Sequence, residues 1–201
     1  MPQASFKTSI YNLIRKKTCP FSAVEKYVPK EGKIYDLGCG FASFSAFMYS
    51  CSNSREIIGV DWIKSRINYA ENMFPDRIKF IYTDIADFII DTCSAILLID
   101  VLYLLPYAKQ KEILIKCYNA LENKGVLLVK EMDSRPLLKY CWCLSQELIV
   151  TKILKRNLST GMYFRKKDDF FRLLQDIGFN VEAVKLDRGY LYPHILYVCK
   201  K

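Results

Sequence analysis

Short apolar runs alternate with segments of helical period along most of the chain. The runs predicted as strands cover 33–37, 55–61, 77–84, 94–100 and 125–133, and the segments predicted as helices cover 42–50, 63–74 and 108–121. The run at 94–100 is continuously apolar, which is typical of a parallel strand covered on both faces. Strands that alternate with helices predict a doubly wound parallel sheet with right-handed crossovers.

The pattern changes near the end of the chain. A helix is predicted over 168–179, with apolar residues at helical spacing before Gly178, and two strands follow at 180–187 and 194–200. Their connection is short, and a short connection forces the two strands to run antiparallel. We therefore predict the α/β class: a doubly wound seven-stranded, mostly parallel sheet with the last strand antiparallel.

Two segments lie outside this alternation. Residues 5–17 predict an amphipathic helix within an N-terminal helical segment, 1–30. Residues 135–164 are rich in Leu, Tyr, Trp and Cys with interspersed basic residues, and they predict a helical cap inserted after the fifth strand, over the carboxyl edge of the sheet. The 201 residues suit a single domain, 1–201, that carries both additions.

Composition narrows the class of protein. Hydrophobic residues make up 51% and charged residues 25%, which excludes a disordered or fibrous chain. No apolar run reaches the roughly 18 residues of a transmembrane segment, and we find no signal peptide, so we expect a cytoplasmic protein. Eight scattered cysteines without a CxxC pair, and one histidine, predict reduced buried thiols and no metal site.

The net charge of +9 admits two interpretations. It fits contact with nucleic acid or with an anionic membrane surface. The basic residues are spread along the chain, however, with only short clusters at 15–17, 152–156 and 165–167, which favours a generally basic surface. Such a surface would also favour an acidic or phosphorylated substrate.

A glycine-containing loop follows the first predicted strand. Asp36 precedes Gly38 and Gly40, which let the backbone turn tightly and approach a ligand closely. Asp61 closes the second strand 23 residues after Gly38, where an acidic residue suits hydrogen bonds to a ribose diol. Because ligands of open α/β sheets bind outside the carboxyl ends of the strands, these residues predict a nucleotide-cofactor site.

The loop distinguishes between two kinds of cofactor. Dinucleotide enzymes use the pattern GxGxxG, whose third glycine packs the helix against the strand, and here that position is Ser43. The residues after the fifth strand also leave little room for a separate substrate domain. A nicotinamide cofactor is therefore disfavoured.

Five stretches carry a more specific signal, in this order: DLGCGFAS, GVDWIKSRINYAEN, IKFIYTDIADF, AILLIDVLYLLP and LENKGVLLVKE. Together they resemble the motifs of the class I S-adenosylmethionine-dependent methyltransferases. The resemblance covers residues 30–132, and 165–200 as topology, because that fold has a seven-stranded sheet with its last strand reversed. The chain departs from the family at Ala42, where glycine is usual, and we expect a backbone angle there that is compatible with alanine.

The resemblance implies S-adenosylmethionine as cofactor and S-adenosylhomocysteine as product. Asp36 would orient the loop and lie near the amino group of the cofactor. Gly38, Cys39 and Gly40 would pass its methionine part and ribose. Asp61 would hold the two ribose hydroxyls.

Further roles follow from the other motifs of the resemblance. Trp62 would flank the adenine, Asp84 would accept a hydrogen bond from the adenine amine, and Ile85 would lie on the ring. Asp100 would lie by the methionine end. The structural alternative for Asp84 and Asp100 is helix capping or a solvated loop.

Methyl transfer needs alignment, exclusion of water and sometimes a base, and Glu131 and His194 are the predicted catalytic residues. His194 has a side chain suited to general-base work, or it merely pairs with a backbone carbonyl in the hairpin. Glu131 is a base, an anchor for a substrate amine, or a residue that only fixes the cap. The candidate substrate-contacting residues are Tyr11, Tyr103, Tyr140, Trp142, Tyr163, Tyr190 and Tyr192.

The motifs disfavour nucleic acid as the substrate. Methyltransferases of base amines resemble one another in an Asn/Asp-Pro-Pro-Tyr/Phe run after the fourth strand, where this chain has DVLYLL. Cytosine-C5 enzymes need a nucleophilic cysteine after that strand, but Cys93 precedes it. The aromatic cap suits a small or lipid-like acceptor, and its cations suit a phosphate, a carboxylate or peripheral contact with an anionic membrane surface.

We therefore predict an S-adenosylmethionine-dependent methyltransferase that acts on a small-molecule acceptor, hydrophobic or anionic. Two alternatives stay open. One is an RNA-modifying methyltransferase, which the charge alone favours. The other is a non-catalytic cofactor- or partner-binding domain that keeps the same fold. The sequence defines neither the acceptor atom nor the oligomeric state.

Overall fold

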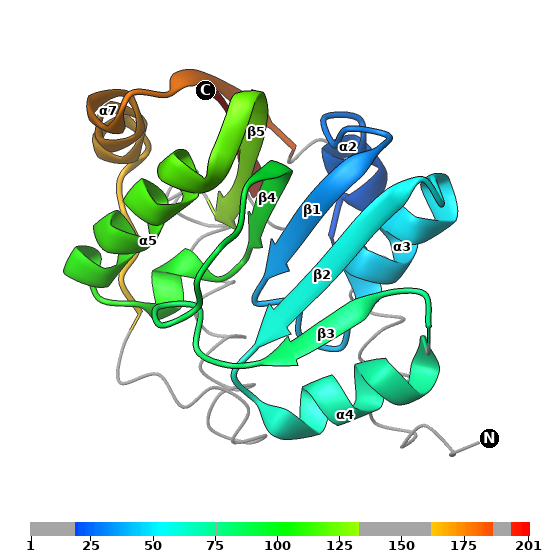
Figure 1. Ribbon diagram of the computed structural model, residues 1–201. Coiled ribbons are helices and arrows are strands. Elements are labelled where there is room, and N and C mark those ends of the chain that lie inside the picture. Colours follow the sequence, from blue (N-terminus) through cyan, green and yellow to red (C-terminus); the bar gives the residue numbers. More distant parts are fainter. Residues whose placement is uncertain (1–18, 75, 133–161, 187–193) are drawn as a thin grey trace.

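A seven-stranded sheet forms the centre of the molecule (Figure 1). The computed structural model describes residues 19–74, 76–132, 162–186 and 194–201. The strands are β1 (Gly32–Leu37), β2 (Arg55–Asp61), β3 (Lys79–Tyr82), β4 (Cys93–Ile99), β5 (Leu121–Met132), β6 (Asn180–Lys185) and β7 (His194–Lys200). Their order in the sheet is β3-β2-β1-β4-β5-β7-β6.

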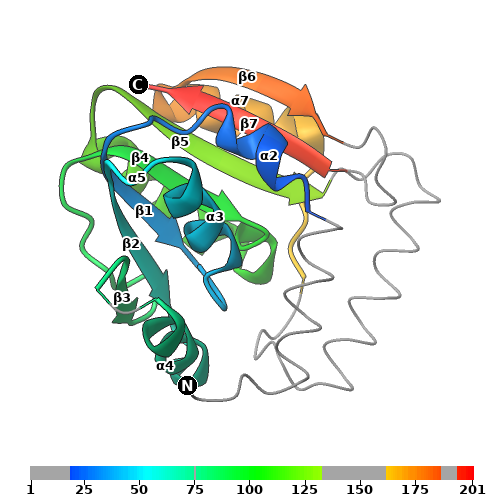
Figure 2. The ribbon, with the colours of Figure 1, turned by 90° about the vertical axis from the view of Figure 1, so that its right-hand side faces the viewer.

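The direction of the strands confirms the predicted topology. Strands β1 to β5 pair in parallel, and β7 is antiparallel to both of its neighbours, β5 and β6. Figure 2 shows the arrowhead of β7 pointing against that of β5. The chain winds outward from β1 to β3 and returns to β4 on the other side of β1, so the crevice of the sheet lies at the carboxyl ends of β1 and β4.

Helices cover both faces of the sheet (Figure 1). They are α2 (Phe21–Glu25), α3 (Ser43–Cys51), α4 (Lys64–Met73), α5 (Tyr107–Ala120) and α7 (Lys167–Ile177), with a 3-10 turn, η1 (Leu102–Leu104). Helices α5 and α7 pack on the face that carries Leu37, Val129 and Tyr197, whereas α2, α3 and α4 pack on the opposite face. The sequence predicted α3, α4, α5 and α7 to within a few residues. Helix α2 lies in the predicted N-terminal helical segment, 1–30, although no separate helix was predicted there, and η1 was not predicted.

A buried arginine fixes the segment before β1. The guanidinium of Arg55 donates to the carboxylate of Glu25 at 2.7 Å and to the carbonyl oxygens of Pro29 and Met48 at 2.6 and 2.7 Å. A buried charge that is paired and hydrogen-bonded avoids most of its desolvation cost. Arg55 therefore anchors α2 and its following turn at the amino edge of the sheet, opposite the crevice.

Several predictions lie outside the described residues. They are the helix at 5–17 with Tyr11, most of the cap at 135–164 with Tyr140 and Trp142, and the hairpin residues Tyr190 and Tyr192. The end of the predicted cap is described, and residues 162–164 have no helical structure, so the helix prediction is wrong there. In the ranges that the structure covers, no helix is both long enough and apolar enough to cross a membrane.

Candidate functional site

Two glycines in the left-handed conformation shape the loop after β1. Gly38 has a φ of 80°, and its N–H donates to the carbonyl of Val60 at 2.7 Å. A Cβ on Gly38 would lie 2.5 Å from Cγ2 of Val101, so no side chain fits there. Gly40 has a φ of 59°, and a Cβ on it would meet no atom within 4 Å. The loop therefore rests on Val101 and turns its Gly40 end toward open space.

Asp61 ties this loop to the end of β2. Its side chain is buried, and its two carboxylate oxygens accept the N–H groups of Gly40 and Ile63 at 3.0 and 2.9 Å. The guanidinium of Arg66 lies 3.6 Å from the oxygen that Gly40 contacts. A carboxylate has about four lone-pair sites, so Asp61 keeps the capacity to accept hydroxyl groups.

The conformation of Ala42 corrects an expectation. Its φ of 57° and ψ of 25° lie in the left-handed region, which favours glycine, so the expected alanine-compatible angle is wrong. The N–H of Ala42 donates to the carbonyl of Cys39 at 3.0 Å, and this tight turn into α3 imposes the conformation. A left-handed alanine costs roughly 1–2 kcal/mol, although its methyl group is fully buried in the core.

Asp36, in β1, and Cys39, between the two glycines, are the remaining predicted residues at the loop. Asp36 is buried and accepts a hydrogen bond of 2.5 Å from the hydroxyl of Ser45 in α3, so it joins β1 to the helix after the loop. Burial, followed by the charges of Asp36 and Asp61, raises the pKa of the Cys39 thiol well above its usual range. That thiol therefore stays protonated, and Cys39 acts through its backbone.

The predicted adenine-side residues follow β2 and β3. Trp62 comes directly after Asp61 and is 45% exposed, as a side chain available to stack on a ring would be. The carboxylate of Asp84 is exposed, and one of its oxygens accepts the N–H of Ala86 at 2.8 Å. That hydrogen bond forms a local turn, which is the structural alternative, at an exposed position. Ile85 is buried beside this turn.

Asp100 ends β4 in a turn that a buried lysine holds. Its φ is 59°, and its N–H donates to the carbonyl of Lys130 at 2.9 Å. The ammonium of Lys130 lies 2.6 Å from Oδ1 of Asp100. The side chain of Lys130 is 1% exposed and that of Asp100 is 16% exposed, so the carboxylate is the part of the pair nearer the open edge.

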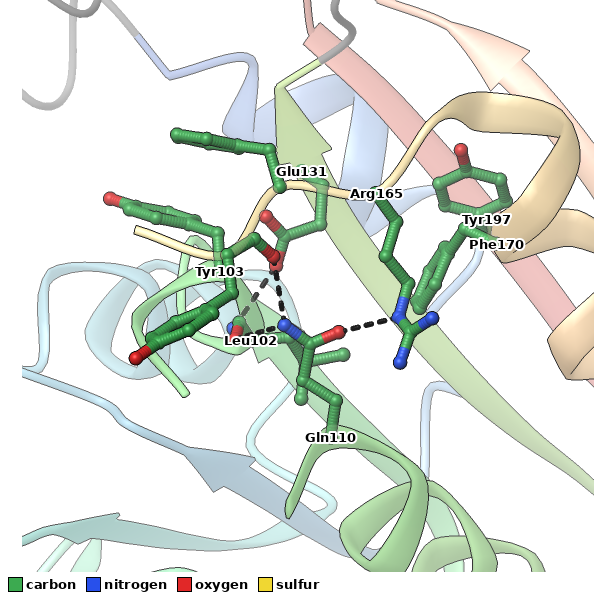
Figure 3. A pocket seen from close by; sticks show the side chains of 9 residues that line it. Leu102, Tyr103, Gln110, Glu131, Arg165, Phe170 and Tyr197 are labelled. Carbon is green, nitrogen blue, oxygen red and sulfur yellow. Dashed lines mark hydrogen bonds between the residues drawn. The ribbon is translucent and has the colours of Figure 1, made fainter. Parts of the chain in front are cut away.

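Glu131 lies on the other face of β5, in a small cavity (Figure 3). Its Oε1 accepts the N–H of Leu102, the first residue of η1, at 3.1 Å. Burial, and then the charge of Asp100, raises the pKa of Glu131 to about 8, so the carboxyl holds a proton at neutral pH. The cavity holds about 20 Å³, roughly the space of one water molecule. This geometry favours a positioning role for Glu131, which holds η1. It disfavours a role as a base that contacts substrate.

A glutamine completes the cavity and holds the returning chain. Gln110 is 1% exposed, and its Nε2 lies 2.9–3.0 Å from the carbonyl oxygens of Leu102, Leu105 and Tyr163, which share its two hydrogens. Its Oε1 accepts the Nε–H of Arg165 at 2.8 Å, as Figure 3 shows. Gln110 thus joins η1 to the segment that leads into α7.

Aromatic contacts reinforce this junction. The rings of Tyr103 and Phe164 stack with centroids 4.8 Å apart, and the N–H of Tyr163 donates to the carbonyl of Tyr103 at 2.7 Å. The Arg165 guanidinium lies 4.5 Å from the centroid of the Tyr107 ring. Two predicted substrate-contacting residues, Tyr103 and Tyr163, are therefore brought together at the crevice.

The two predicted catalytic residues lie on opposite faces of the sheet. Glu131 pairs with Ile195 and Met132 pairs with His194, and successive residues of a strand point to opposite faces. His194 is buried at the edge where β5 ends, as predicted, and its carbonyl accepts the N–H of Leu186 at 2.8 Å. The structure thus places His194 at the carboxyl end of β5 but on the face opposite Glu131.

The sequence reasoning missed four residues of this edge: Arg66, Gln110, Lys130 and Arg165. Of these four residues, Lys130 could have been identified from the sequence pattern. Val126, Leu128 and Lys130 share one face of the fifth strand, so the alternation alone places a lysine in line with buried residues. Gln110 and Arg165 act through contacts between elements that are distant in the sequence, which no local pattern encodes. Arg66 lies only five residues after Asp61, but the side-chain contact between them depends on the turn from β2 into α4. Among the described residues, no cluster of His, Cys, Asp and Glu could hold a metal ion.

The strand order, and the loop after β1 that Asp61 holds, are those of the class I S-adenosylmethionine-dependent methyltransferases. These are enzymes whose cofactor is S-adenosylmethionine. The family described as "Methyltransferase domain" matches residues 29–178. The chain belongs to that family, which confirms the resemblance drawn from the five motifs.

Individual relatives agree with this assignment. The carboxy-S-adenosyl-L-methionine synthase of Campylobacter jejuni is 28% identical over 109 residues, which are 53% of this chain and 46% of that protein. The chain spans about half the length of the curated relatives it matches.

Solved structures share the fold. An O-methyltransferase family protein of Burkholderia thailandensis has a TM-score of 0.76 at 14% identity, over 96% of this chain and 59% of that chain. Human N-acetylserotonin methyltransferase, solved with S-adenosylmethionine, has a TM-score of 0.73 at 19% identity, over 96% of this chain and 54% of that chain.

Proposed function

We propose that this protein transfers a methyl group from S-adenosylmethionine to a small-molecule acceptor that is hydrophobic or anionic. One observation carries the proposal. The loop at Gly38 and Gly40 is bound to the Asp61 carboxylate at the carboxyl edge of the sheet, and the space over Gly40 is open. A ligand could therefore approach the backbone of the loop closely, and the Asp61 carboxylate beside it could accept hydrogen bonds from a ribose.

The residues present fit the cofactor. Gly40 leaves room that a side chain would fill, Asp61 has acceptor capacity for the two ribose hydroxyls, and Trp62 offers an exposed ring for the adenine. Asp84 would accept from the adenine amine, and Asp36 would orient the loop. When bound, S-adenosylmethionine supplies an electrophilic methyl group on a positively charged sulfur.

The acceptor would lie beside η1. Tyr103 and Phe164 form a stacked aromatic pair at this edge, and Tyr163 is partly exposed next to them. Aromatic walls and a net charge of +9 support an acceptor with an apolar part or a negative charge. The human relative named above acts, by its name, on N-acetylserotonin, a small molecule.

The chain's contribution to methyl transfer would be mainly alignment. Glu131 accepts the N–H of Leu102 and so fixes η1, the turn that carries the buried Tyr103. His194 stays our candidate for a general base, because it lies at the edge where β5 ends. Its position on the face opposite Glu131 means that these two residues do not act as a catalytic pair.

A second candidate function comes from the curated relatives, which are named carboxy-S-adenosyl-L-methionine synthases. In that case the cofactor itself would be the substrate, and the product would be a carboxylated form of it. The same loop and the same Asp61 would hold the nucleoside. The two candidates therefore differ in the product and not in the binding site.

Mass spectrometry of the products tests both candidates. Purified protein is incubated with methyl-labelled S-adenosylmethionine and a cell extract, with Asp61→Ala as the inactive control. The proposal predicts label in a small molecule and S-adenosylhomocysteine as the nucleoside product. Label in RNA would overturn the small-molecule assignment, a carboxylated nucleoside would establish the second candidate, and unchanged cofactor would favour a non-catalytic binding domain.

A further inference from the structure

A buried ion pair lies between β4 and β5. The Lys130 side chain is 1% exposed, and its Nζ is 2.6 Å from Oδ1 of Asp100. Fully buried lysines are rare in proteins unless they are paired, because burial removes the hydration of the ammonium group. The backbone carbonyl of Lys130 also accepts the N–H of Asp100, at 2.9 Å. Backbone and side chain together therefore fix the position of Asp100.

The Asp100 turn is in contact with the glycine loop. Val101 follows Asp100, and its side chain fills the space where a Cβ on Gly38 would lie. Gly38 begins the loop whose other end opens at Gly40. The Asp100 side chain is 16% exposed, whereas the Lys130 side chain is 1% exposed, so the carboxylate is the accessible member of the pair. A ligand over the loop would meet the negative member of the pair first.

We propose that Lys130 is a positioning residue that sets the place and the effective charge of Asp100 toward the methionine end of the cofactor. The pair would thereby tune the preference of the site between S-adenosylmethionine, whose sulfur is positive, and S-adenosylhomocysteine, whose sulfur is neutral. This inference rests on the proposed function, since it assumes that both molecules bind at the loop. On this proposal, Lys130 influences how strongly the site prefers S-adenosylmethionine over the product, S-adenosylhomocysteine.

The sign of each effect follows from the charges. In the native pair, Lys130 partly neutralises the field of Asp100. Without the ammonium group, the full charge of the carboxylate attracts the positive sulfur and has no effect on the neutral one. Without the carboxylate, that attraction is lost and any remaining charge on Lys130 repels the positive sulfur. A role in packing alone would weaken both ligands by the same factor.

Calorimetry on four variants separates these possibilities. The quantity measured is the Kd of S-adenosylhomocysteine divided by the Kd of S-adenosylmethionine. Lys130→Met is expected to raise this ratio and Asp100→Asn to lower it, each by about tenfold. The double variant should fall between them. Lys30→Met is the matched control, because Lys30 also has an Nζ–O distance of 2.6 Å, to Glu25, but lies before β1 at the opposite edge.

Each outcome decides the proposal. Opposite shifts in Lys130→Met and Asp100→Asn, with no shift in Lys30→Met, support it. A ratio within about twofold of the wild-type value in either variant, or shifts in the same direction, overturns it. Should Lys130→Met not fold, Lys130→Gln takes its place, because the amide removes the positive charge but can still donate a hydrogen bond to the Asp100 carboxylate. If the wild-type protein binds neither molecule, the proposed function fails, whereas binding of both without a change of ratio refutes only the role of Lys130.

Discussion

At the scale of single residues, Ala42 shows how a local conflict is tolerated at a ligand loop. The residue lies in a left-handed conformation that glycine adopts without strain, and its methyl group is fully buried. The conformational cost of roughly 1–2 kcal/mol is partly offset by about 0.8 kcal/mol from burying one methyl group. The motif pattern identified the position but could not give the angle, because the angle depends on the turn from Cys39 into α3.

Two fully buried alanines test this balance. Ala42→Gly should change the free energy of unfolding by less than about 1 kcal/mol, because the lost methyl burial is matched by relief of strain. Ala70→Gly, in the regular helix α4, should cost about 2 kcal/mol, from the lost methyl group and the poor helix propensity of glycine. Urea unfolding measures both, and equal costs would contradict the strain assigned to Ala42.

Asp61 carries the second prediction at this scale. Asp61→Asn replaces an oxygen that accepts an N–H with an amide that cannot, so the tie to Gly40 or to Ile63 is broken. The affinities for S-adenosylmethionine and S-adenosylhomocysteine should fall together by at least about tenfold, which calorimetry measures. Asp76→Asn, at an exposed position after α4, is the control and should have no effect. Unchanged affinity in Asp61→Asn would refute the ribose assignment.

At the scale of elements, η1 is held from two sides. Glu131 of β5 holds its first N–H, and Gln110 of α5 holds its carbonyl and the returning chain. The sequence showed a strong helical period for α5 and an apolar run for β5, so both elements were predicted. It did not show η1, which has only three residues and no period, and it did not show the partners of Gln110, which lie up to 55 residues away.

Glu131 makes the stability of the fold depend on pH. Its pKa is raised from 4.5 to about 8 by burial and by Asp100, against the opposing effect of Lys130. Between these values the folded chain keeps a proton that the unfolded chain has lost, so the free energy of unfolding falls as the pH rises through this window. Glu131→Gln mimics the protonated carboxyl. It should match the wild type near pH 4, below both pKa values, and exceed its stability above pH 8 by more than about 1 kcal/mol.

Unfolding curves at the two pH values check this expectation. The exposed Glu122 lies on the same strand, and Glu122→Gln should show no such difference between the two pH values. A stability difference between Glu131→Gln and the wild type that does not change with pH would contradict the assignment of a proton to Glu131.

Gln110 gives an independent test of the junction at η1. Gln110→Ala leaves buried carbonyl groups and Arg165 without this partner, so the free energy of unfolding should fall by about 2–3 kcal/mol. Gln175→Ala, at an exposed position in α7, should change it by less than about 0.5 kcal/mol. Similar small effects of both substitutions in thermal or urea unfolding would show that the junction is not held by Gln110.

At the scale of the whole molecule, the alternation of strands and helices was sufficient to predict the seven-stranded sheet and its reversed strand. Parallel strands buried on both faces give long apolar runs, and a short connection permits only an antiparallel pair. The carboxyl-edge residues Asp36, Gly38, Gly40 and Asp61 were predicted because they lie at the ends of the first two strands or in the loop after the first. The Lys130–Asp100 pair, and the separation of Glu131 from His194, depend on register across the sheet and had to be read from the structure.

The central claim is that the loop after β1 binds S-adenosylmethionine. Isothermal titration calorimetry of the folded wild-type protein with S-adenosylmethionine and S-adenosylhomocysteine tests it most directly. We expect both molecules to bind at one site per chain, and to compete with each other for it. Folded protein that binds neither molecule would contradict the claim.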